Sequence, residues 1–403
     1  MSFARRRPSP PADPGSFAWH LFVPCRDEAA VIGRSVCRLR ADFPSVHIWV
    51  VDDDSEDGTG AIVAGLAATD PLLHLVRRRR PYARTGKGDA LNAAYHALCA
   101  WLPTGTGRDR VLIGVVDADG ALDPGVLVKV AGPGGFADPR VGAVQIAVWM
   151  ANRHDARPVP GRGRIANALA RCLIRMQDLE FRCTIAAMQL LRTHTASVGL
   201  GGNGQFTRLS VLDEIARRHR QPWHGALLED YELGLHVLLA GYRNRYVHDA
   251  HVAQEALPGA RRLLTQRTRW VQGNLQCLRY LPAILRSPHF SNAGAVEAGY
   301  FLLLPYGQLV GVLAWPVAGW YAGVGGWALV AILLLGALPA AVWGPVYRRT
   351  CEPAAPWWTG VGWGLLHWLY LHLMVLAIPR AFARAVFRRT GWAKTRRNAE
   401  VVG

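Results

Sequence analysis

The feature that most constrains this chain is a series of apolar segments near its C-terminal end. Three stretches, Val296–Tyr321, Trp327–Val346 and Trp357–Ile378, each reach the roughly 20 residues that a membrane-spanning helix needs. Tryptophans gather at their ends, as interfacial anchors do. Core helices of a soluble protein are the alternative, but three in succession are difficult to bury in a chain of 403 residues. The sequence therefore predicts a transmembrane region over residues 291–379.

The positions of basic residues limit how these stretches can cross a bilayer. The positive-inside rule places Arg348, between the second and third stretches, and the basic tail 380–403 in the cytoplasm. Three full crossings would leave that tail on the side opposite the polar domain. We therefore expect one stretch to be re-entrant or interfacial. The third stretch is the first candidate, because it leaves both basic segments cytoplasmic, and the first stretch, which Pro305 interrupts, is the other.

The chain as a whole is strongly basic. A net charge of +17 and a pI near 10.2 favour an anionic partner: phospholipid, nucleic acid or a phosphorylated substrate. The basic residues gather largely in membrane-proximal segments and tails, so membrane lipids account for them and we expect no nucleic-acid partner. Seven cysteines without a CxxC pair favour a reducing, cytosolic site for the polar part. Residues 1–15 are rich in proline and predict a disordered tail.

From residue 16 onward, strand and helix signals alternate, which predicts an α/β domain on a mostly parallel sheet. Ligands of such sheets bind at the carboxyl ends of the strands, and two acidic clusters fall there. "VVDDDSEDGT" carries Asp52 and Asp53, and "VVDADG" carries Asp117 and Asp119. Adjacent carboxylates repel each other unless a cation or donors occupy the site, and Mg²⁺ or Mn²⁺ take oxygen ligands. A helix cap or a solvated turn is the alternative for each cluster alone.

Three further motifs carry side chains that a catalytic site can use. "GKGDALN" sets Lys87 in a glycine-flanked loop before a helix, where it can meet a phosphate, although a solvated lysine is the alternative. "LLED" sets Glu229 and Asp230 at a helix start, either as partners of the helix dipole or as a base for a hydroxyl group. "GLGGNGQF" offers Asn203 and Gln205 to a hydroxyl-rich ligand, and a plain tight turn is equally compatible with it.

A basic amphipathic segment, 261–290, precedes the apolar stretches. Its sequence "LLTQRTRWVQGNLQ" combines Gln266, Arg267, Arg269 and Trp270 in one helical-looking segment. A helix that lies on lipid headgroups is one interpretation, and a part of an active site is the other. One helix can serve both purposes.

Seven motifs occur in the order and rough spacing of one family: "VPCRDEAAVIG", "VVDDDSEDGT", "GKGDALN", "DADG", "GGNGQFTRLSVL", "LLEDYELGLHVLLAGYR" and "QRTRW". With them the chain resembles the membrane-bound family 2 inverting glycosyltransferases, which include cellulose, chitin and hyaluronan synthases and bacterial enzymes that make exopolysaccharides or glycolipids. The resemblance implies a GT-A type nucleotide-sugar-binding domain, Rossmann-like with a mostly parallel sheet, over residues 16–260. An interfacial helix (261–290), a transmembrane region (291–379) and a basic cytoplasmic tail (380–403) would follow.

The resemblance also implies roles for residues at the strand ends. Asp53, with Asp52 beside it, would hold the uracil or ribose of a UDP-sugar, and Lys87 would lie near the nucleotide. Asp117 and Asp119 would form the DxD motif that binds Mg²⁺ or Mn²⁺ beside the diphosphate.

For the transfer step, the resemblance makes Asp230, next to Glu229, the general base of the family's ED motif. In the family's Q-x-x-R-W motif the cations meet the leaving diphosphate and the tryptophan stacks on the acceptor. This motif would be formed here by Gln266, Arg267, Arg269 and Trp270. The terminal "GWAKTRR", residues 391–397, is similar to a tryptophan-containing motif that ends some of these synthases.

The function implied is that of a multi-pass enzyme of the inner (plasma) membrane with a cytoplasmic catalytic domain. It would transfer a sugar from a UDP-sugar to a growing β-linked surface polysaccharide or oligosaccharide. The alternative acceptor is a lipid hydroxyl such as that of diacylglycerol, which suits the short membrane region. A membrane-tethered nucleic-acid-binding or scaffold protein is the non-enzyme alternative.

Two residues near the predicted site depart from the family pattern. Asp54 replaces a small residue of that pattern, and Leu228 replaces a threonine before the ED motif.

Overall fold

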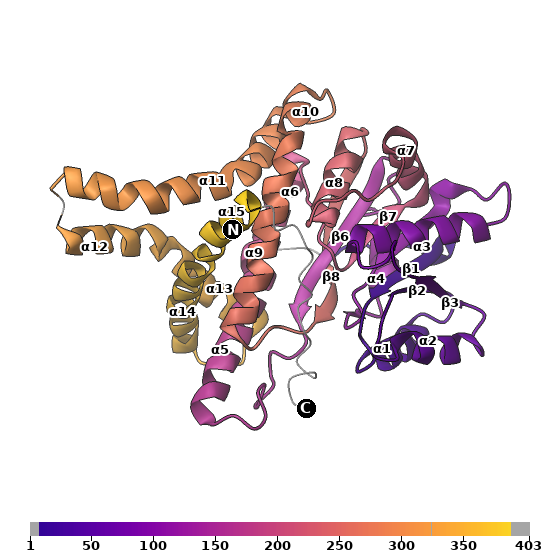
Figure 1. The fold of residues 1–403 in the computed structure, drawn as a ribbon, viewed down its shortest axis with the longest axis horizontal. Coiled ribbons are helices and arrows are strands. Elements are labelled where there is room, and N and C mark those ends of the chain that lie inside the picture. Colours follow the sequence, from indigo (N-terminus) through magenta and orange to yellow (C-terminus); the bar gives the residue numbers. More distant parts are fainter. Residues whose placement is uncertain (1–7, 324, 388–403) are drawn as a thin grey trace.

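In the computed structural model the chain forms a sheet-based domain, and a group of helices extends from one side of it (Figure 1). The structure describes residues 8–323 and 325–387. The first part of the predicted tail 1–15, most of the basic segment 380–403 and the terminal motif 391–397 lie outside the described residues.

The sheet is mixed, with a parallel core. Within the described residues, eight strands follow the order β3-β2-β1-β4-β7-β6-β8-β5. β1 pairs in parallel with β2 and β4, β2 with β3, and β6 with β8, whereas β7 runs antiparallel between β4 and β6, and β5 antiparallel to β8. The predicted α/β fold with a mostly parallel sheet is confirmed. The strands are β1 (Ala18–Cys25), β2 (His47–Asp53), β3 (Leu73–Arg78), β4 (Val111–Val115), β5 (Ala121–Leu122), β6 (Val141–Met150), β7 (Gln205–Arg208) and β8 (Arg243–Gln254).

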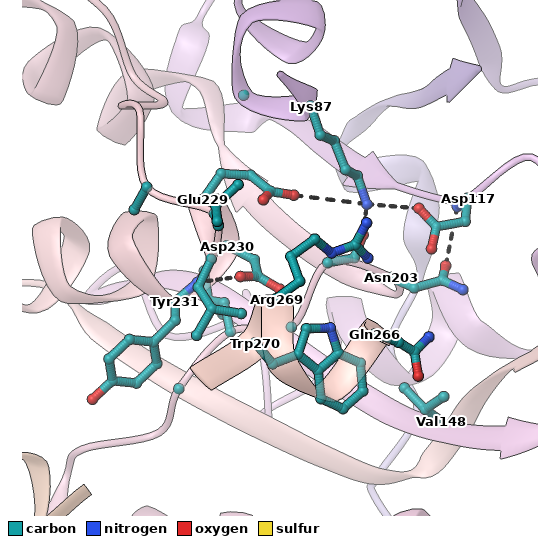
Figure 2. A pocket seen from close by; sticks show the side chains of 18 of the residues that line it. Lys87, Asp117, Val148, Asn203, Glu229, Asp230, Tyr231, Gln266, Arg269 and Trp270 are labelled. Atoms are coloured by element: carbon teal, nitrogen blue, oxygen red, sulfur yellow. Dashed lines mark hydrogen bonds and ion pairs between the residues drawn. The ribbon is translucent and has the colours of Figure 1, made fainter. Parts of the chain in front are cut away.

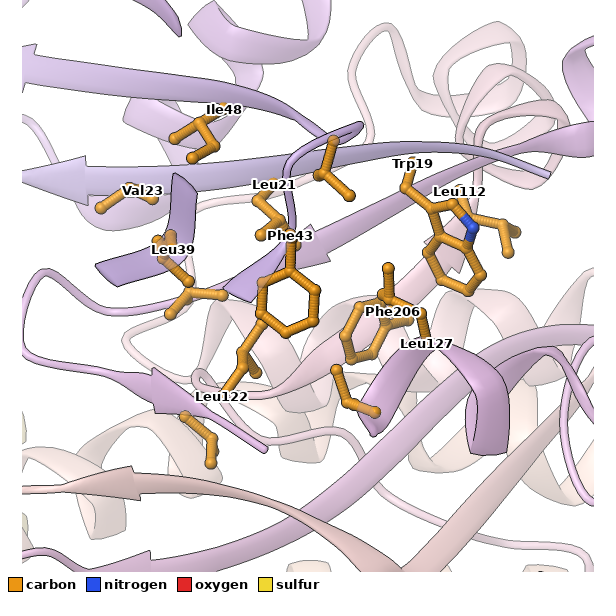
Figure 3. Close-up of a cluster of buried hydrophobic side chains, with 14 of the residues drawn as sticks. Trp19, Leu21, Val23, Leu39, Phe43, Ile48, Leu112, Leu122, Leu127 and Phe206 are labelled. Carbon is orange, nitrogen blue, oxygen red and sulfur yellow. The ribbon is translucent and has the colours of Figure 1, made fainter. Parts of the chain in front are cut away.

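Helices cover both faces of this sheet, which is why its central strands are apolar on both sides. Alternate residues of β1 enter different cores: Leu21 and Val23 contact one face, and Phe22 contacts the other. The first core also takes residues from α1, α2 and α4, and Figure 3 shows it around Phe43 and Phe206. The second takes residues from α3, α7 and α8. These helices are α1 (Ile32–Asp42), α2 (Thr59–Ala67), α3 (Lys87–Trp101), α4 (Val126–Ala131), α7 (Leu209–His219) and α8 (Glu229–Leu239).

A long helical segment follows the sheet strand β6. It consists of α5 (Arg164–Leu179), one π-helical stretch η4 (Glu180–Ile185) and α6 (Ala186–Thr195). A π-helical stretch widens the helix locally and is common at functional sites. Short 3-10 turns elsewhere are η2 (Pro14–Ser16), η3 (Arg108–Arg110), η5 (Leu278–Tyr280) and η6 (Leu338–Val342).

The C-terminal part is helical. Figure 1 shows α11 and α12 projecting together away from the sheet, while α9 lies between the sheet domain and the remaining helices. The helices are α9 (Ala260–Cys277), α10 (Leu281–Arg286), α11 (Asn292–Tyr321), α12 (Gly326–Ala337), α13 (Trp343–Cys351), α14 (Trp357–Val375) and α15 (Ala377–Val386).

Three membrane-spanning helices are not confirmed. In the part of the chain that the structure describes, one helical segment, Trp357–Val386, is long and apolar enough to cross a bilayer. The second predicted stretch, Trp327–Val346, is not one helix: α12 is followed by the turn η6, which contains Pro339, and then by α13. Proline cannot donate the backbone hydrogen bond of a continuing helix, which accounts for the break.

Helix α9 packs closely against the loop that precedes α8. A Cβ atom on Gly273 would lie 2.5 Å from the backbone nitrogen of Leu228, so only glycine permits this approach. Leu228 immediately precedes the acidic pair Glu229 and Asp230. The close contact therefore brings the segment with the Q-x-x-R-W pattern beside the ED pattern, although about 40 residues of chain separate them.

Candidate active site

A cavity of about 870 Å³ lies between the carboxyl ends of the sheet strands and helix α9. Its polar end is formed by the acidic and cationic residues Asp53, Lys87, Asp117, Asp119, Glu229, Asp230 and Arg269. Its apolar wall comes from η4, α6 and α11 and consists of Phe181, Ile185, Met188, Leu304 and Pro305. Gln266, Arg267, Trp270 and Asn203 also line the cavity, whereas Asp52 and Gln205 do not.

The two adjacent aspartates at the end of β2 have different surroundings. Asp53 faces the cavity, pairs with Arg78 and accepts a hydrogen bond from the backbone N–H of Arg84 at 3.0 Å. Its Oδ2 atom is buried without a hydrogen-bond partner in the described residues, and burial raises the pKa of its carboxyl group. Asp52 points into the turn instead, where it accepts a hydrogen bond from the Ser55 N–H at 3.0 Å. Asp53 therefore offers a carboxylate oxygen to a ligand, while Asp52 stabilises the turn.

The acidic pair after β4 lies at the centre of the polar end. Asp117 contacts Lys87 Nζ at 2.6 Å, and its backbone N–H donates to Asn203 Oδ1 at 3.2 Å. Asp119 accepts a hydrogen bond from the backbone N–H of Glu255 at 3.3 Å. The Asp117 side chain remains 35% exposed toward the cavity. Carboxylate oxygens are the ligands that Mg²⁺ and Mn²⁺ prefer, so this donor set fits such an ion.

Lys87 connects the acids of two different motifs. It begins α3, and its Nζ atom donates to Asp117 and to the Gly202 carbonyl oxygen, both at 2.6 Å, and lies 3.9 Å from Glu229. Burial opposes its charge, but the carboxylates of Asp117 and Glu229 outweigh this effect and raise its pKa. Lys87 is therefore a permanent cation at the N-terminus of a helix, where phosphate groups bind readily.

Glu229 and Asp230 occupy the first turn of α8 and are each 8% exposed. Burial, and for Glu229 the neighbouring Asp230, raise the pKa of both carboxyl groups. Such a shift brings a carboxylate closer to the basicity that a general base needs near neutral pH. Figure 2 shows Glu229 directed at Lys87, with Asp230 below it toward α9.

The two arginines of α9 have different environments. Arg269 enters the polar end, where it experiences the charges of the same three carboxylates as Lys87, those of Asp117, Glu229 and Asp230. Burial lowers its pKa, while Glu229, Asp117 and Asp230 act in the opposite direction. Two cations at the same end of a cavity favour the binding of an anion there.

Arg267 also lines the cavity, but its guanidinium group contacts η4 and α14 instead of the acidic cluster. It pairs with Glu180 of η4 and donates to the Tyr370 hydroxyl of α14 at 3.0 Å, and Tyr370 in turn donates to Glu180 at 2.7 Å. Its guanidinium group lies 4.1 Å from the centre of the Trp270 ring. Trp270 also packs edge-on against Phe181. Arg267 therefore holds the tryptophan in place and joins α9 to α14.

The glycine-rich loop supplies one of its two predicted residues to the cavity. Asn203 lines it, accepts from Asp117 and donates to Gln254 Oε1 at 2.9 Å. Gln205 lies in β7 and does not line the cavity, and its amide atoms are buried without hydrogen-bond partners in the described residues. Asn203 therefore orients the DxD pair.

Several residues that line the cavity or support its lining were not predicted from the sequence. Glu180 and Tyr370 hold the Q-x-x-R-W segment, and Gln254 and Glu255 at the end of β8 support the DxD pair. Glu255 follows the strand β8, which was not predicted from the sequence, so the acid at its end was not recognised. Nothing in the local sequence indicates that α11 reaches the cavity wall.

Comparisons with known proteins give one consistent family. A family described as "Glycosyltransferase like family 2" matches residues 16–273. A beta-monoglucosyldiacylglycerol synthase of Synechocystis sp. is 30% identical over 93% of this chain and 74% of that protein. A protein of the same name from Trichormus variabilis is 30% identical, but the match spans 65% of this chain and 49% of that protein.

Among solved structures, a mannosyltransferase from Pyrobaculum calidifontis in complex with GDP-Man and Mn²⁺ has a TM-score of 0.53. The alignment is 20% identical and covers 90% of each chain, and this likeness shows a shared GT-A fold.

Proposed function

Because the chain belongs to the family 2 glycosyltransferases, we propose that this hexosyltransferase moves one hexose from a UDP-sugar to the hydroxyl group of a membrane lipid. The observation that carries the proposal is the division of the cavity into a polar end and an apolar wall. The polar end suits a sugar nucleotide, and the apolar wall suits an acyl chain. The names of the relatives support a lipid acceptor over the polysaccharide acceptor that the sequence motifs favour.

The donor would bind at the polar end. Asp53 would accept a hydrogen bond from the nucleoside through its Oδ2 atom, which has no partner among the residues that the structure describes. Asp117 and Asp119 would hold a divalent cation, Mg²⁺ or Mn²⁺, which supplies positive charge to the diphosphate when bound. Lys87 and Arg269 would contact the diphosphate oxygens, because both cationic side chains line the polar end.

The chemistry would be a single displacement at the anomeric carbon. Asp230 would accept the proton of the acceptor hydroxyl as the new carbon–oxygen bond forms. The bond between the sugar and the diphosphate breaks, and its electron pair stays on the diphosphate oxygen, beside Lys87 and Arg269. Glu229 would hold Lys87 in place, since the two groups lie 3.9 Å apart. Attack from the face opposite the leaving group inverts an α-linked donor to a β-linked product.

The acceptor would reach Asp230 along the apolar wall, with Trp270 as a platform for its polar head. Large apolar side chains are exposed on the C-terminal helices, among them Val310, Leu313, Trp320, Trp327 and Trp357. An exposed apolar surface of this kind suits contact with lipid. We propose that these helices associate with the plasma membrane and that the catalytic domain lies on its cytoplasmic side.

The test is product analysis with the purified full chain in detergent. UDP-glucose, UDP-galactose and UDP-N-acetylglucosamine would each be supplied with Mg²⁺ or Mn²⁺ and with either diacylglycerol or an oligosaccharide. We expect one UDP-sugar to yield a single glycolipid by mass spectrometry. A ladder of sugar lengths would refute the lipid acceptor, and the absence of nucleotide release with every donor and acceptor would refute the transfer activity.

A further inference from the structure

Two histidines and a glutamate meet beside α8, and the proposed transfer uses none of their side chains. His224 precedes the helix, and Glu232 and His236 lie on it one turn apart. One ligand atom of each lies within 4.8 Å of the others. The two imidazoles face each other, with 2.9 Å between His224 Nδ1 and His236 Nε2. Glu232 and His236 are almost completely buried.

Hydrogen bonding alone does not satisfy this cluster. Only one of the two facing nitrogens can donate in a pair of neutral rings. The other nitrogen of His224, Nε2, is buried without a hydrogen-bond partner in the described residues. Burial lowers the pKa of both rings, so each is neutral and has a lone pair available for a metal.

Glu232 retains a free acceptor position. It accepts from the Tyr280 hydroxyl at 2.7 Å and from the Ala226 N–H at 3.1 Å, and it pairs with Arg279. An ionised carboxylate has about four acceptor positions, so one remains. The Arg279 side chain is 56% exposed, which lets the guanidinium group move to solvent when another cation binds Glu232.

We propose that His224, Glu232 and His236 bind one zinc ion, separate from the divalent cation of the DxD pair. Two imidazole nitrogens and one carboxylate oxygen are ligands that Zn²⁺ takes in four-coordinate sites, whereas Mg²⁺ prefers oxygen alone. The Tyr280 hydroxyl, 3.2 Å from His236 Nε2, or a water molecule completes the set. The ion joins the loop before α8 to the helix itself and so fixes the position of Glu229 and Asp230.

The experiment measures how much zinc the purified full chain retains after treatment with a chelator. Excess Mg²⁺ is present throughout, so that the carboxylates of the DxD pair do not hold zinc. Metal analysis of the wild type should give about one zinc per chain, since the apparent affinity of sites with histidine ligands is high near pH 7. His236→Gln should retain less than a tenth of that amount. His96→Gln changes an exposed histidine on α3 and should bind zinc as the wild type does.

Cobalt substitution keeps the test decisive if His236→Gln does not fold. Wild-type protein loaded with Co²⁺ should show the visible absorption of a four-coordinate site, and Zn²⁺ should displace it. Zinc should also raise the melting temperature of the wild type but not of His224→Gln. The proposal would be overturned if the wild-type chain held no zinc and, when loaded with Co²⁺, did not show the absorption of a four-coordinate site. Zinc retention by a folded His236→Gln variant at the wild-type level would overturn it as well.

Discussion

The polar end and the apolar wall of the cavity are assembled in different ways. The polar end rests on strand ends: Asp53 is the last residue of β2 and Asp117 follows β4, and the parallel strand β1, which pairs with both, brings the two ends to the same side of the sheet. The apolar wall consists of the continuous segment η4–α6 and of α11, which is distant from it in sequence and contacts both α6 and α9. A site on a sheet edge is positioned by backbone hydrogen bonds, whereas the helical wall depends on a few buried side-chain contacts. Substitutions at the polar end should therefore lower turnover, whereas substitutions in the helical wall and its supports should change stability or the KM for the acceptor.

The largest effect is expected from the base itself. Asp230→Asn removes the group that takes the acceptor proton, so turnover should fall by about 10²–10⁴-fold. Donor binding should persist, because Asp230 makes none of the proposed contacts to the nucleotide. Steady-state turnover together with calorimetric UDP binding measures both effects. Wild-type turnover by this variant would remove Asp230 from the mechanism.

The two arginines of α9 allow the polar end and the helical wall to be compared within one helix, because Arg269 belongs to the first and Arg267 supports the second. Arg269→Ala should lower turnover by about 10²–10³-fold with an unchanged melting temperature, because its cation faces the leaving group. Arg267→Ala should instead destabilise the protein by about 3–5 kcal/mol, because it leaves the largely enclosed Glu180 carboxylate with the Tyr370 hydroxyl but without its cationic partner. Turnover and thermal unfolding of both variants separate the roles. If both arginines affect turnover alone, the structural role of Arg267 is wrong.

The different construction of the two regions explains what the sequence could predict. Asp53, Lys87, Asp117 and Asp230 belong to short motifs at strand ends or helix starts, and the rule that ligands meet there locates them. The structure brings all four to one cavity. Asp52 belongs to the same motif as Asp53, but a strand alternates its side chains between faces, and local spacing does not reveal which one reaches the cavity.

The acceptor side could not be predicted in the same way. Arg267 and Arg269 are two residues apart on one helix, and only the presence of Glu180 and Tyr370 distinguishes their environments. These partners lie 87 and 103 residues away in the sequence. The apolar stretches were predicted to cross a membrane, yet Leu304 of the first one lines the cavity. Hydrophobicity identifies an apolar helix but not the surface against which it packs.

The contact between α9 and α14 should produce an intermediate effect. Tyr370→Phe removes the hydroxyl that joins Arg267 and Glu180, at a cost of about 1–3 kcal/mol in stability. Because Arg267 holds Trp270, the KM for the lipid acceptor should rise while the KM for the donor stays constant. Tyr300→Phe, on the exposed face of α11, is the matched control. An equal rise in both KM values would mean that the contact supports the whole cavity.

The smallest expected effect comes from the apolar wall, and it tests the lipid acceptor most directly. Leu304→Gln places a polar amide among Phe181, Met188 and Pro305, so the KM for a long-chain diacylglycerol should rise roughly tenfold. The neighbouring Leu303 is 46% exposed and does not line the cavity, so Leu303→Gln should leave that KM unchanged.

The dependence on acyl length distinguishes contact with the lipid from a general disturbance of α11. If the wall holds an acyl chain, the difference between wild type and Leu304→Gln should shrink as the chains of the acceptor are shortened. This follows because the free energy of burying an acyl chain grows with each methylene, by about 0.8 kcal/mol. An effect of Leu304→Gln that is independent of acyl length would place the lipid elsewhere and leave only the polar end as substrate site.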